Sequence, residues 1–264
     1  MSLFGSLYTG VSGLNAQAQS TAMISNNIAN MTTTGFKKQR LEFKDLMYQH
    51  LSRPGATSST AGTVIPAGLS LGLGVKPSAT YRSHEQGTLQ ITDGDMDLAI
   101  NGRGFFQIEL PSGETAYTRA GSFQMNQDGE IVTSEGYRLL PGITVPSDAV
   151  YVEVNTQGEV LAKMPAQVAM QNLGQIELAN FVNPAGLESV GDTMFMETEA
   201  SGAAIAGIPG ETNFGTIKQG VLEQSNVDSV KEITLLITAQ RAYEMNSNVI
   251  STSDEMMDTV NQLR

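Results

Sequence analysis

The stretch that decides the fold is "LLITAQRAYEMNSNVISTSDEMMDTVNQL", residues 235–263. Apolar residues recur in it every seven positions in two adjacent rows, Leu235, Ala242, Val249, Met256 and Leu263 in one and Leu236, Tyr243, Ile250 and Met257 in the other. Two neighbouring heptad rows predict a helix with a seam wider than that of a two-stranded coiled coil. Asn226 or Asp228 can cap its first turn. We therefore predict a C-terminal helix, residues 227–264, that packs against other helices.

The N-terminal segment shows a similar pattern. Leu3, Leu7, Val11, Leu14, Ala18, Thr21, Ile24 and Ile28 follow one another at steps of three or four residues, which places them on one helical stripe. Gly5, Gly10 and Gly13 weaken such a helix by about 1 kcal/mol each relative to alanine, but they allow a neighbour to approach closely. We predict that residues 1–45 hold the N-terminal helix of an inner domain and that it pairs with the C-terminal helix as in a coiled coil.

The N-terminal segment is also free of charge, since no Asp, Glu, Lys, Arg or His precedes Lys37. Its last part, "SNNIANMTTTGF" (25–36), consists mostly of amides and hydroxyls. Such a surface can be buried at little cost, whereas an unpaired buried charge costs several kcal/mol. One hypothesis is that copies of the same helix surround it and that both chain ends become ordered when neighbours bury them. The alternative is a neutral helix exposed to water.

Between the two ends the period of the pattern changes to two. Leu69, Leu71, Leu73 and Val75 alternate with serine and glycine after Arg53-Pro54-Gly55, which predicts an extended β arm over residues 46–85. Short apolar runs then predict strands at 105–110, 116–119, 123–125, 150–154 and 175–181, with turns at 111–113, 126–129 and 155–158. We predict a central antiparallel β domain over 86–209 and a return linker over 210–226, giving an α+β fold.

Composition limits the possible functions. A formal charge of −12 argues against nucleic acid, whose binding requires cations for the phosphates, and the absence of cysteine excludes thiolate chemistry. The N-terminus lacks a signal-peptide pattern, so we expect no cleavable signal. Asp93, Asp95 and Asp97 begin like a calcium loop but lack its glycine and its final glutamate. We therefore predict no catalytic, cofactor or metal site.

Long stretches of the chain carry a family resemblance: "SNNIANMTTTGFKKQRLEFKDLMYQ" (25–49), "RPGA" (53–56), "GLGVKPSATYRSHEQGTLQIT" (72–92), "DLAINGRGFFQIELPSGETAYTRAGSFQMNQDGEIV" (97–132) and "QGVLEQSNVDSVKEITLLITAQRAYEMNSNVISTSDEMM" (219–257). They resemble the bacterial flagellar axial proteins of the rod and hook group, over nearly the whole chain. The stretch from Arg53 with its glycine-rich arm is similar to an insertion typical of distal-rod members.

The resemblance implies a structural subunit of the flagellar basal body that is exported through the flagellar type III apparatus and forms a rigid, straight, hollow rod across the periplasm. Its implied partners are other copies of itself in a helical polymer, proximal rod proteins, the hook protein, and the proteins of the peptidoglycan and outer-membrane rings. The assembly seam would be formed by the heptad residues of the C-terminal helix and by Leu3, Leu7, Val11, Leu14, Ile24 and Ile28. The inter-subunit arm would comprise Arg53, Pro54, Gly55, Leu69, Leu71, Leu73 and Val75.

Two alternatives remain open at this point. The opening "MSLFGSLYTGVSGL" (1–14) is similar to hook and proximal-rod relatives, so the chain could be a subunit of either. A secreted β-rich module that binds or cleaves cell-wall glycan is the other, with Asp93–Asp97 or Glu109 and Glu114 as paired carboxylates.

Overall fold

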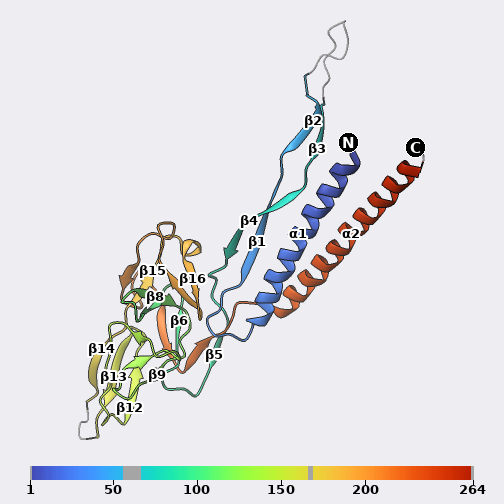
Figure 1. Ribbon diagram of the computed structural model, residues 1–264. Helices are drawn as coiled ribbons and strands as arrows, with labels where there is room; N and C mark the ends of the chain where they lie inside the picture. The colour runs from blue at the N-terminus through green and yellow to red at the C-terminus, as the bar shows by residue number, and fades with distance from the viewer. Residues whose placement is uncertain (1, 56–66, 166–168, 263–264) are drawn as a thin grey trace. The chain divides into compact units, whose positions relative to one another are not determined.

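The computed structural model describes residues 2–55, 67–165 and 169–262, so Leu263 of the predicted seam lies outside it. The predicted α+β class is confirmed, because two helices, α1 (Ser2–Ala29) and α2 (Ser229–Gln262), enclose a long series of strands in the sequence. The chain divides into two compact units (Figure 1). Unit 1 comprises the described residues of 1–28, 39–81 and 228–264, and unit 2 those of 29–38 and 82–227.

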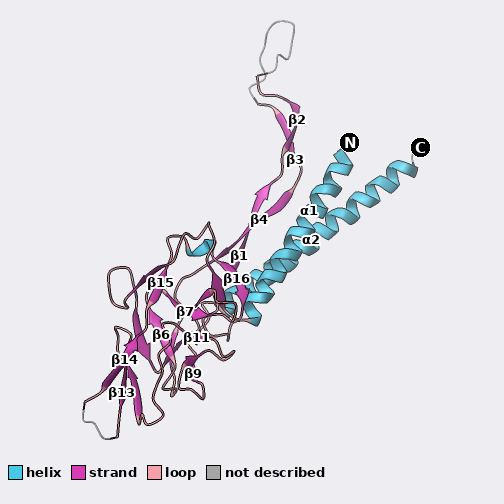
Figure 2. Ribbon diagram, turned by 60° about the vertical axis from the view of Figure 1, so that its left-hand side comes forward, coloured by secondary structure: helices cyan, strands magenta, loops and turns pink. Residues whose placement is uncertain are grey.

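Unit 1 combines both helices with four strands. These strands are β1 (Gln39–Asp45), β2 (Tyr48–Ser52), β3 (Leu69–Gly72) and β4 (Val75–Arg82). β1 pairs with β4, and β2 pairs antiparallel with β3, with Tyr48 opposite Gly72 and Gln49 opposite Leu71 (Figure 2). We call the β2–β3 pair the arm hairpin.

The two helices lie side by side and run antiparallel (Figures 1 and 2). Ser6 Oγ lies 3.3 Å from Ser253 Oγ near one end. Further along, a β-carbon added to Gly10 would lie 3.0 Å from Ile250 Cγ1, and one added to Gly13 would lie 2.7 Å from Asn246 Nδ2. At the other end Asn27 Nδ2 donates to Glu232 Oε2 at 3.2 Å. The close approach predicted at the three glycines is therefore confirmed at Gly10 and Gly13, whereas a β-carbon added to Gly5 would have no atom within 4 Å.

The helix ends follow from local chemistry. Asp228 caps α2, since its Oδ1 accepts the backbone N–H of Val230 at 3.1 Å and of Lys231 at 3.3 Å. Those bonds, together with the Lys231 side chain, lower the pKa of Asp228. α1 ends at Ala29, and residues 39–45 of the predicted N-terminal helical segment form β1 instead. The break follows from three consecutive β-branched threonines and from Gly35 with φ at +70°.

Unit 2 contains the remaining strands: β5 (Leu89–Ile91), β6 (Leu98–Asn101), β7 (Phe105–Glu109), β8 (Thr115–Thr118), β9 (Gln124–Met125), β10 (Ile131–Val132), β11 (Arg138–Leu139), β12 (Tyr151–Val154), β13 (Glu159–Lys163), β14 (Gln171–Gln175), β15 (Leu178–Asn180), β16 (Glu188–Gly191), β17 (Met194–Met196), β18 (Ile205–Gly207), β19 (Thr216–Gln219) and β20 (Val221–Glu223). A short 3-10 helix, Pro184–Gly186, precedes β16. The largest sheet has nine strands and runs β16-β17-β8-β7-β11-β10-β9, with β15 joining β7 and β18 joining β15. Its pairs, such as β7 with β8, are antiparallel, as predicted.

Two apolar clusters form the core of unit 2. The larger contains Leu98, Ile100, Phe106, Phe123, Ile131, Leu139, Ile143, Val145, Val152, Val154, Val160, Ile176, Leu178 and Ile217. The smaller contains Phe105, Tyr117, Ala179, Phe181 and Phe195. The strand predicted at 175–181 is divided between β14 and β15, because Ile176 turns away to donate its N–H to the carbonyl of Gly158 at 2.8 Å.

The predicted turns at 126–129 and 155–158 are confirmed, and they share one hydrogen-bond pattern. Asn126 Oδ1 accepts the N–H groups of Asp128 at 3.0 Å and Glu130 at 2.8 Å. Asn155 Oδ1 accepts those of Gln157 and Glu159, both at 2.9 Å. In each turn the asparagine side chain replaces a backbone acceptor, as the sequence pattern indicated.

Residues 29–38 belong to unit 2 although they directly follow α1. The N–H of Gly35 donates to the carbonyl of Glu223 at 2.8 Å, and its positive φ brings it against the backbone of Ala120. A β-carbon at Gly35 would lie 2.5 Å from the backbone nitrogen of Ala120, a distance that real contacts do not reach.

We expect Gly35→Ala to destabilise unit 2 by clearly more than the ~1–2 kcal/mol of a left-handed alanine, because steric overlap adds to the backbone strain. Urea unfolding of the full chain measures the change. Gly136→Ala is the matched control, since Gly136 has φ at +88° but no atom within 4 Å of an added β-carbon. Equal losses in the two variants would contradict the close contact.

Candidate assembly surfaces and a buried ion cluster

The first heptad row of α2 lies beside the face that meets α1 and stays largely exposed. Leu235, Val249 and Met256 expose 52%, 45% and 49% of their surface, and Ala242 between them is half-buried. We call Leu235, Ala242, Val249 and Met256 the outer row. In the second predicted row Leu236, Ile250 and Met257 are half-buried and Tyr243 is exposed. α2 therefore keeps a continuous apolar stripe for which unit 1 provides no cover.

The face of α2 that meets α1 is made of small and polar residues. Glu232, Ala239 and Ser253 are buried there, and Asn246 contacts Gly13. These four positions are also spaced by seven residues, but their side chains are small or polar, so they do not belong to the apolar heptad pattern. The signal that could have found them is the heptad spacing itself, taken together with the two glycines of α1.

The predicted seam residues of α1 share one stripe of the helix but differ in burial. Ile24 is buried, Leu7, Leu14 and Ile28 are half-buried, and Val11 is exposed. Nothing is described for the side chain of Leu3. Asn27, which the sequence did not single out, is almost fully buried, and its side chain bonds both the N–H and the C=O of Gln39, at 3.0 and 2.9 Å.

The predicted arm residues lie at both ends of the arm hairpin. Arg53, Pro54, Gly55, Leu69 and Leu71 are exposed, whereas Leu73 and Val75 are half-buried. Leu73 and Val75 lie at the base of the hairpin, the end nearer to α1. There Val75 donates its N–H to Ser12 Oγ on α1 at 3.3 Å, and Leu46 donates its N–H to the carbonyl of Gly74 at 2.8 Å. The base of the hairpin is held against its own helix, while the part beyond it offers apolar side chains to solvent.

A buried ion cluster lies in unit 2. Glu223 has no exposed surface, and its two oxygens meet Lys37 Nζ at 2.6 Å and Arg119 Nη1 at 3.3 Å. Gly87 donates its N–H to the same carboxylate at 2.8 Å. Lys37 also donates to the carbonyl of Glu85 at 2.7 Å. Burial lowers the pKa of Lys37, which the carboxylate of Glu223 opposes.

Asn226 extends this cluster with an uncharged network. Its Oδ1 accepts the N–H of Lys38 at 2.7 Å, and its Nδ2 donates to the carbonyls of Ser83 at 3.0 Å and Glu85 at 3.1 Å. Asn226 and Glu223 together bind the chain around residue 37 and around residue 85 to the segment that leads into α2. These are three of the places where the chain passes between the two units. No motif or periodicity in the sequence indicates this convergence.

His84 lies beside the cluster in an aromatic environment. Its ring meets Phe105 and Phe195 edge-on, with centroids 5.6 and 5.5 Å away, and its Nδ1 is buried without a hydrogen-bond partner. Burial lowers the pKa of His84 to about 4, and the positive charges of Lys37, Arg82 and Arg119 contribute to the shift. His84 is therefore neutral at physiological pH.

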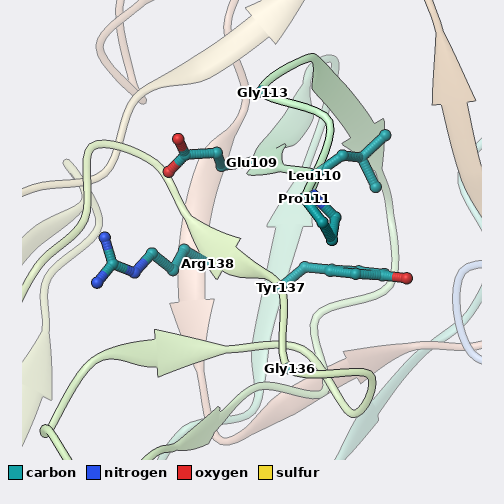
Figure 3. Close-up of a pocket in the computed structure, with 7 residues that line it drawn as sticks. All are labelled: Glu109, Leu110, Pro111, Gly113, Gly136, Tyr137 and Arg138. Carbon is teal, nitrogen blue, oxygen red and sulfur yellow. The ribbon is translucent and has the colours of Figure 1, made fainter.

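The acidic residues considered for glycan chemistry do not form a paired site. Glu109 lines a hollow of about 340 Å³ on the surface of unit 2 (Figure 3), and it is the one carboxylate among the described residues of that lining. Glu114 is held by Ser112, and Asp97 accepts a hydrogen bond from Thr92 Oγ1 at 2.6 Å. Within the described part of the chain no group of three or more His, Cys, Asp or Glu is placed to hold a metal ion. Over the same residues no helix has the length and apolarity to cross a membrane.

Three family models match the chain. Residues 7–37 match a flagella basal body rod protein model, residues 99–162 match the D1 domain of the flagellar hook protein FlgE/F/G model, and residues 218–263 match the C-terminal model of flagellar basal body rod FlgEFG proteins. The first and last matches cover α1 and α2, and the middle one covers strands of unit 2.

Curated relatives match over almost the full length. The chain is 54% identical to the flagellar basal-body rod protein FlgG of Caulobacter vibrioides, with 98% of both chains covered. It is 46% identical to FlgG of Agrobacterium fabrum over 97% of this chain and 98% of the relative. It is 38% identical to FlgG of Bacillus subtilis, with 98% of both chains covered.

We expect Glu223→Gln to destabilise the chain by about 3–5 kcal/mol, because it leaves Lys37 and Arg119 buried without their counter-charge. Urea unfolding measures the loss. Arg138→Gln is the control, because it breaks an ion pair with Glu130 in which the arginine side chain is 54% exposed, and such pairs contribute about 1 kcal/mol or less. If Glu223→Gln lowered the free energy of unfolding by no more than the control does, the cluster would not be desolvated.

The neutral state of His84 makes stability depend on pH. The unfolded chain takes up a proton near pH 6.5 and the folded chain near pH 4, so the stabilisation is complete above pH 6.5 and is lost as the pH falls from 6.5 towards 4. The shift corresponds to a loss on the order of 3 kcal/mol.

Unfolding curves at several pH values test this. His84→Gln, which stays neutral, should remove that part of the slope, whereas His50→Gln, at an exposed position on β2, should leave it unchanged. The same slope in the His84→Gln variant and the unmodified chain would refute the assignment.

Proposed function

Because this chain belongs to the FlgG family of flagellar basal-body rod proteins, we propose that it is a structural subunit of the flagellar distal rod, a rigid shaft that transmits torque from the motor to the hook. Family models for rod proteins match both ends of the chain, and FlgG relatives match it over 97–98% of its length. These matches do not favour the proximal-rod and hook alternatives, nor the glycan-binding module.

The observation that carries the proposal is the outer row of α2. Leu235, Val249 and Met256 lie on a long helix that already has a partner on another face, and they remain about half exposed. Burying an apolar side chain contributes about 1.5–3 kcal/mol, so a row of four favours association along the helix. The heptad spacing suits neighbouring helices.

We infer that α1 and α2 form the inner layer of the rod as a coiled-coil-like pair. Their mutual contact uses Ser6, Gly10 and Gly13 of α1, so the outer row of α2 remains available for other copies. α1 carries no charge before Lys37, which suits a helix enclosed by neighbours. Unit 2 would then form the outer layer, and a contact that joins unlike surfaces of successive copies builds a helical filament instead of a closed ring.

The arm hairpin is proposed to stiffen this filament. Its exposed apolar residues, Leu69 and Leu71 among them, have no cover in unit 1, and a two-stranded hairpin is marginally stable by itself. An added contact between copies that are not joined through the helices would resist bending. Such a contact is consistent with a straight shaft.

The family also supports the other partners of the proposal. A rod subunit of this kind would be delivered by the flagellar type III export apparatus and would bind proximal rod proteins below and the hook protein above. It would cross the periplasm inside the peptidoglycan and outer-membrane rings. Its task would be mechanical, without catalysis or a cofactor.

We expect Val249→Asp to abolish polymerisation and motility while the monomer remains folded. Val249 is exposed in the monomer, so a charge there costs little, but in the polymer it would be buried without a partner, at a cost of several kcal/mol. Circular dichroism of the monomer, sedimentation of the polymer and complementation of a strain that lacks its own rod subunit measure the three effects.

Asn248→Asp is the matched control, because it adds the same charge one position earlier at an exposed site outside the outer row. It should polymerise and support motility. Normal rods from the Val249→Asp variant would rule out the outer row as an assembly surface.

A further inference from the structure

Unit 2 has a groove at the turn that follows β9. The groove has a volume of about 470 Å³ and is lined by residues 95–96, 125–129, 144–147 and 149–152. Pockets of this size bury drug-sized groups, so the groove has room for two or three side chains of a bound segment.

The groove is both apolar and acidic. Met125, Val150 and Tyr151 line it and are exposed, Val150 to 69%. Asp95 and Asp128 are also part of the lining, and no Lys, Arg or His belongs to its described residues. A ligand that suits this groove has apolar side chains and a positive charge.

A strand borders the groove. β12 supplies Tyr151 and Val152 to the lining and is the outer strand of the sheet β12-β13-β14. Its outer edge is already occupied, because Gln219 Oε1 accepts the N–H of Val154 and Gln219 Nε2 donates to the carbonyl of Val152, both at 2.9 Å. A bound segment would therefore meet the groove through its side chains.

The arm hairpin has the complementary chemistry. The segment 46–81 contains no Asp or Glu, although the whole chain carries 27 of them; it contains Arg53 next to β2 and Lys76 on the following strand β4. On the hairpin Met47, Tyr48, Leu51, Leu69 and Leu71 are exposed. It is already extended, so little further ordering is needed for it to bind.

We propose that the groove of unit 2 binds the arm hairpin of another copy of this chain. The proposal rests on the proposed function and adds the receptor surface for the arm. Opposite charges on the two surfaces would set the register and disfavour pairing of like surfaces. Because hairpin and groove are different surfaces, each copy offers one of each to successive neighbours, and the contact propagates along the filament.

The chain has no cysteine, so single cysteines can map the contact without background. One full-length variant carries Leu71→Cys in the arm hairpin, and a second, with a mass tag, carries Val150→Cys in the groove. The two are mixed, polymerised and oxidised, and covalent heterodimers are quantified by mass. The control pairs Leu71→Cys with Val182→Cys, an 83% exposed residue of unit 2 outside the groove lining.

We expect several-fold more heterodimer from the groove pair than from the control pair. Equal yields, or polymers without the groove heterodimer, would overturn the inference and leave the proposed function intact. A chain that carries both Leu71→Cys and Val150→Cys tests the remaining case. A disulfide that forms only within that chain would also overturn the inference, because the hairpin would then fill its own groove. If the unmodified chain forms no polymer, the proposed function fails and the inference fails with it.

Charge reversal gives a second test that needs no cysteine. Asp95→Lys with Asp128→Lys in the groove, or Arg53→Glu with Lys76→Glu in the arm, should each slow polymerisation several-fold. All four changes in one chain should restore most of the rate, because the attraction is re-established with opposite signs. A fourfold variant as slow as the slower pair would contradict the charge complementarity.

Discussion

Glu223 is a carboxylate without exposed surface, and the cations that neutralise it come from segments far apart in the sequence. A buried charge of this kind is tolerated only with partners in place, so Lys37 and Arg119 must be present for unit 2 to keep this arrangement. Lys37 stands at the end of residues 29–38, and the carboxylate also holds Gly87. One side chain thus determines where the chain enters and leaves the β domain.

This constraint has a mechanical meaning for a rod subunit. The chain joins the two units covalently at residues 28–29, 38–39, 81–82 and 227–228, so torque passing between the units acts on these connections. On the unit 2 side, the carboxylate of Glu223 and the amide of Asn226 fix the segments next to the last three of these connections. The cluster therefore favours connectors that move together with the sheet, instead of three independent hinges.

The sequence predicted what depends on local periodicity. Heptad rows located α2, Asp228 was one of two proposed caps, and asparagine and glycine located the turns at 126–129 and 155–158. It did not predict which face of α2 meets α1, because large apolar residues were assumed to pack first, whereas Glu232, Ala239 and Ser253 are the buried ones. The ion cluster was also missed, because Lys37, Arg119 and Glu223 are more than eighty residues apart and only the tertiary fold brings them together.

The charged residues of α2 are unevenly distributed around the helix, and this distribution favours burial of one of its stripes in a polymer. Arg241, Glu244, Glu255 and Asp258 fall on one exposed stripe with Asn248 and Ser251, at alternating steps of three and four. Three of the four outer-row residues, Leu235, Val249 and Met256, are also exposed in the monomer, but the row contains no charge. Exposure of the single chain therefore cannot explain the difference between the stripes. A neighbour that covers the outer row and leaves the charged stripe in water does explain it, because a charge would be costly on the first surface and costs nothing on the second.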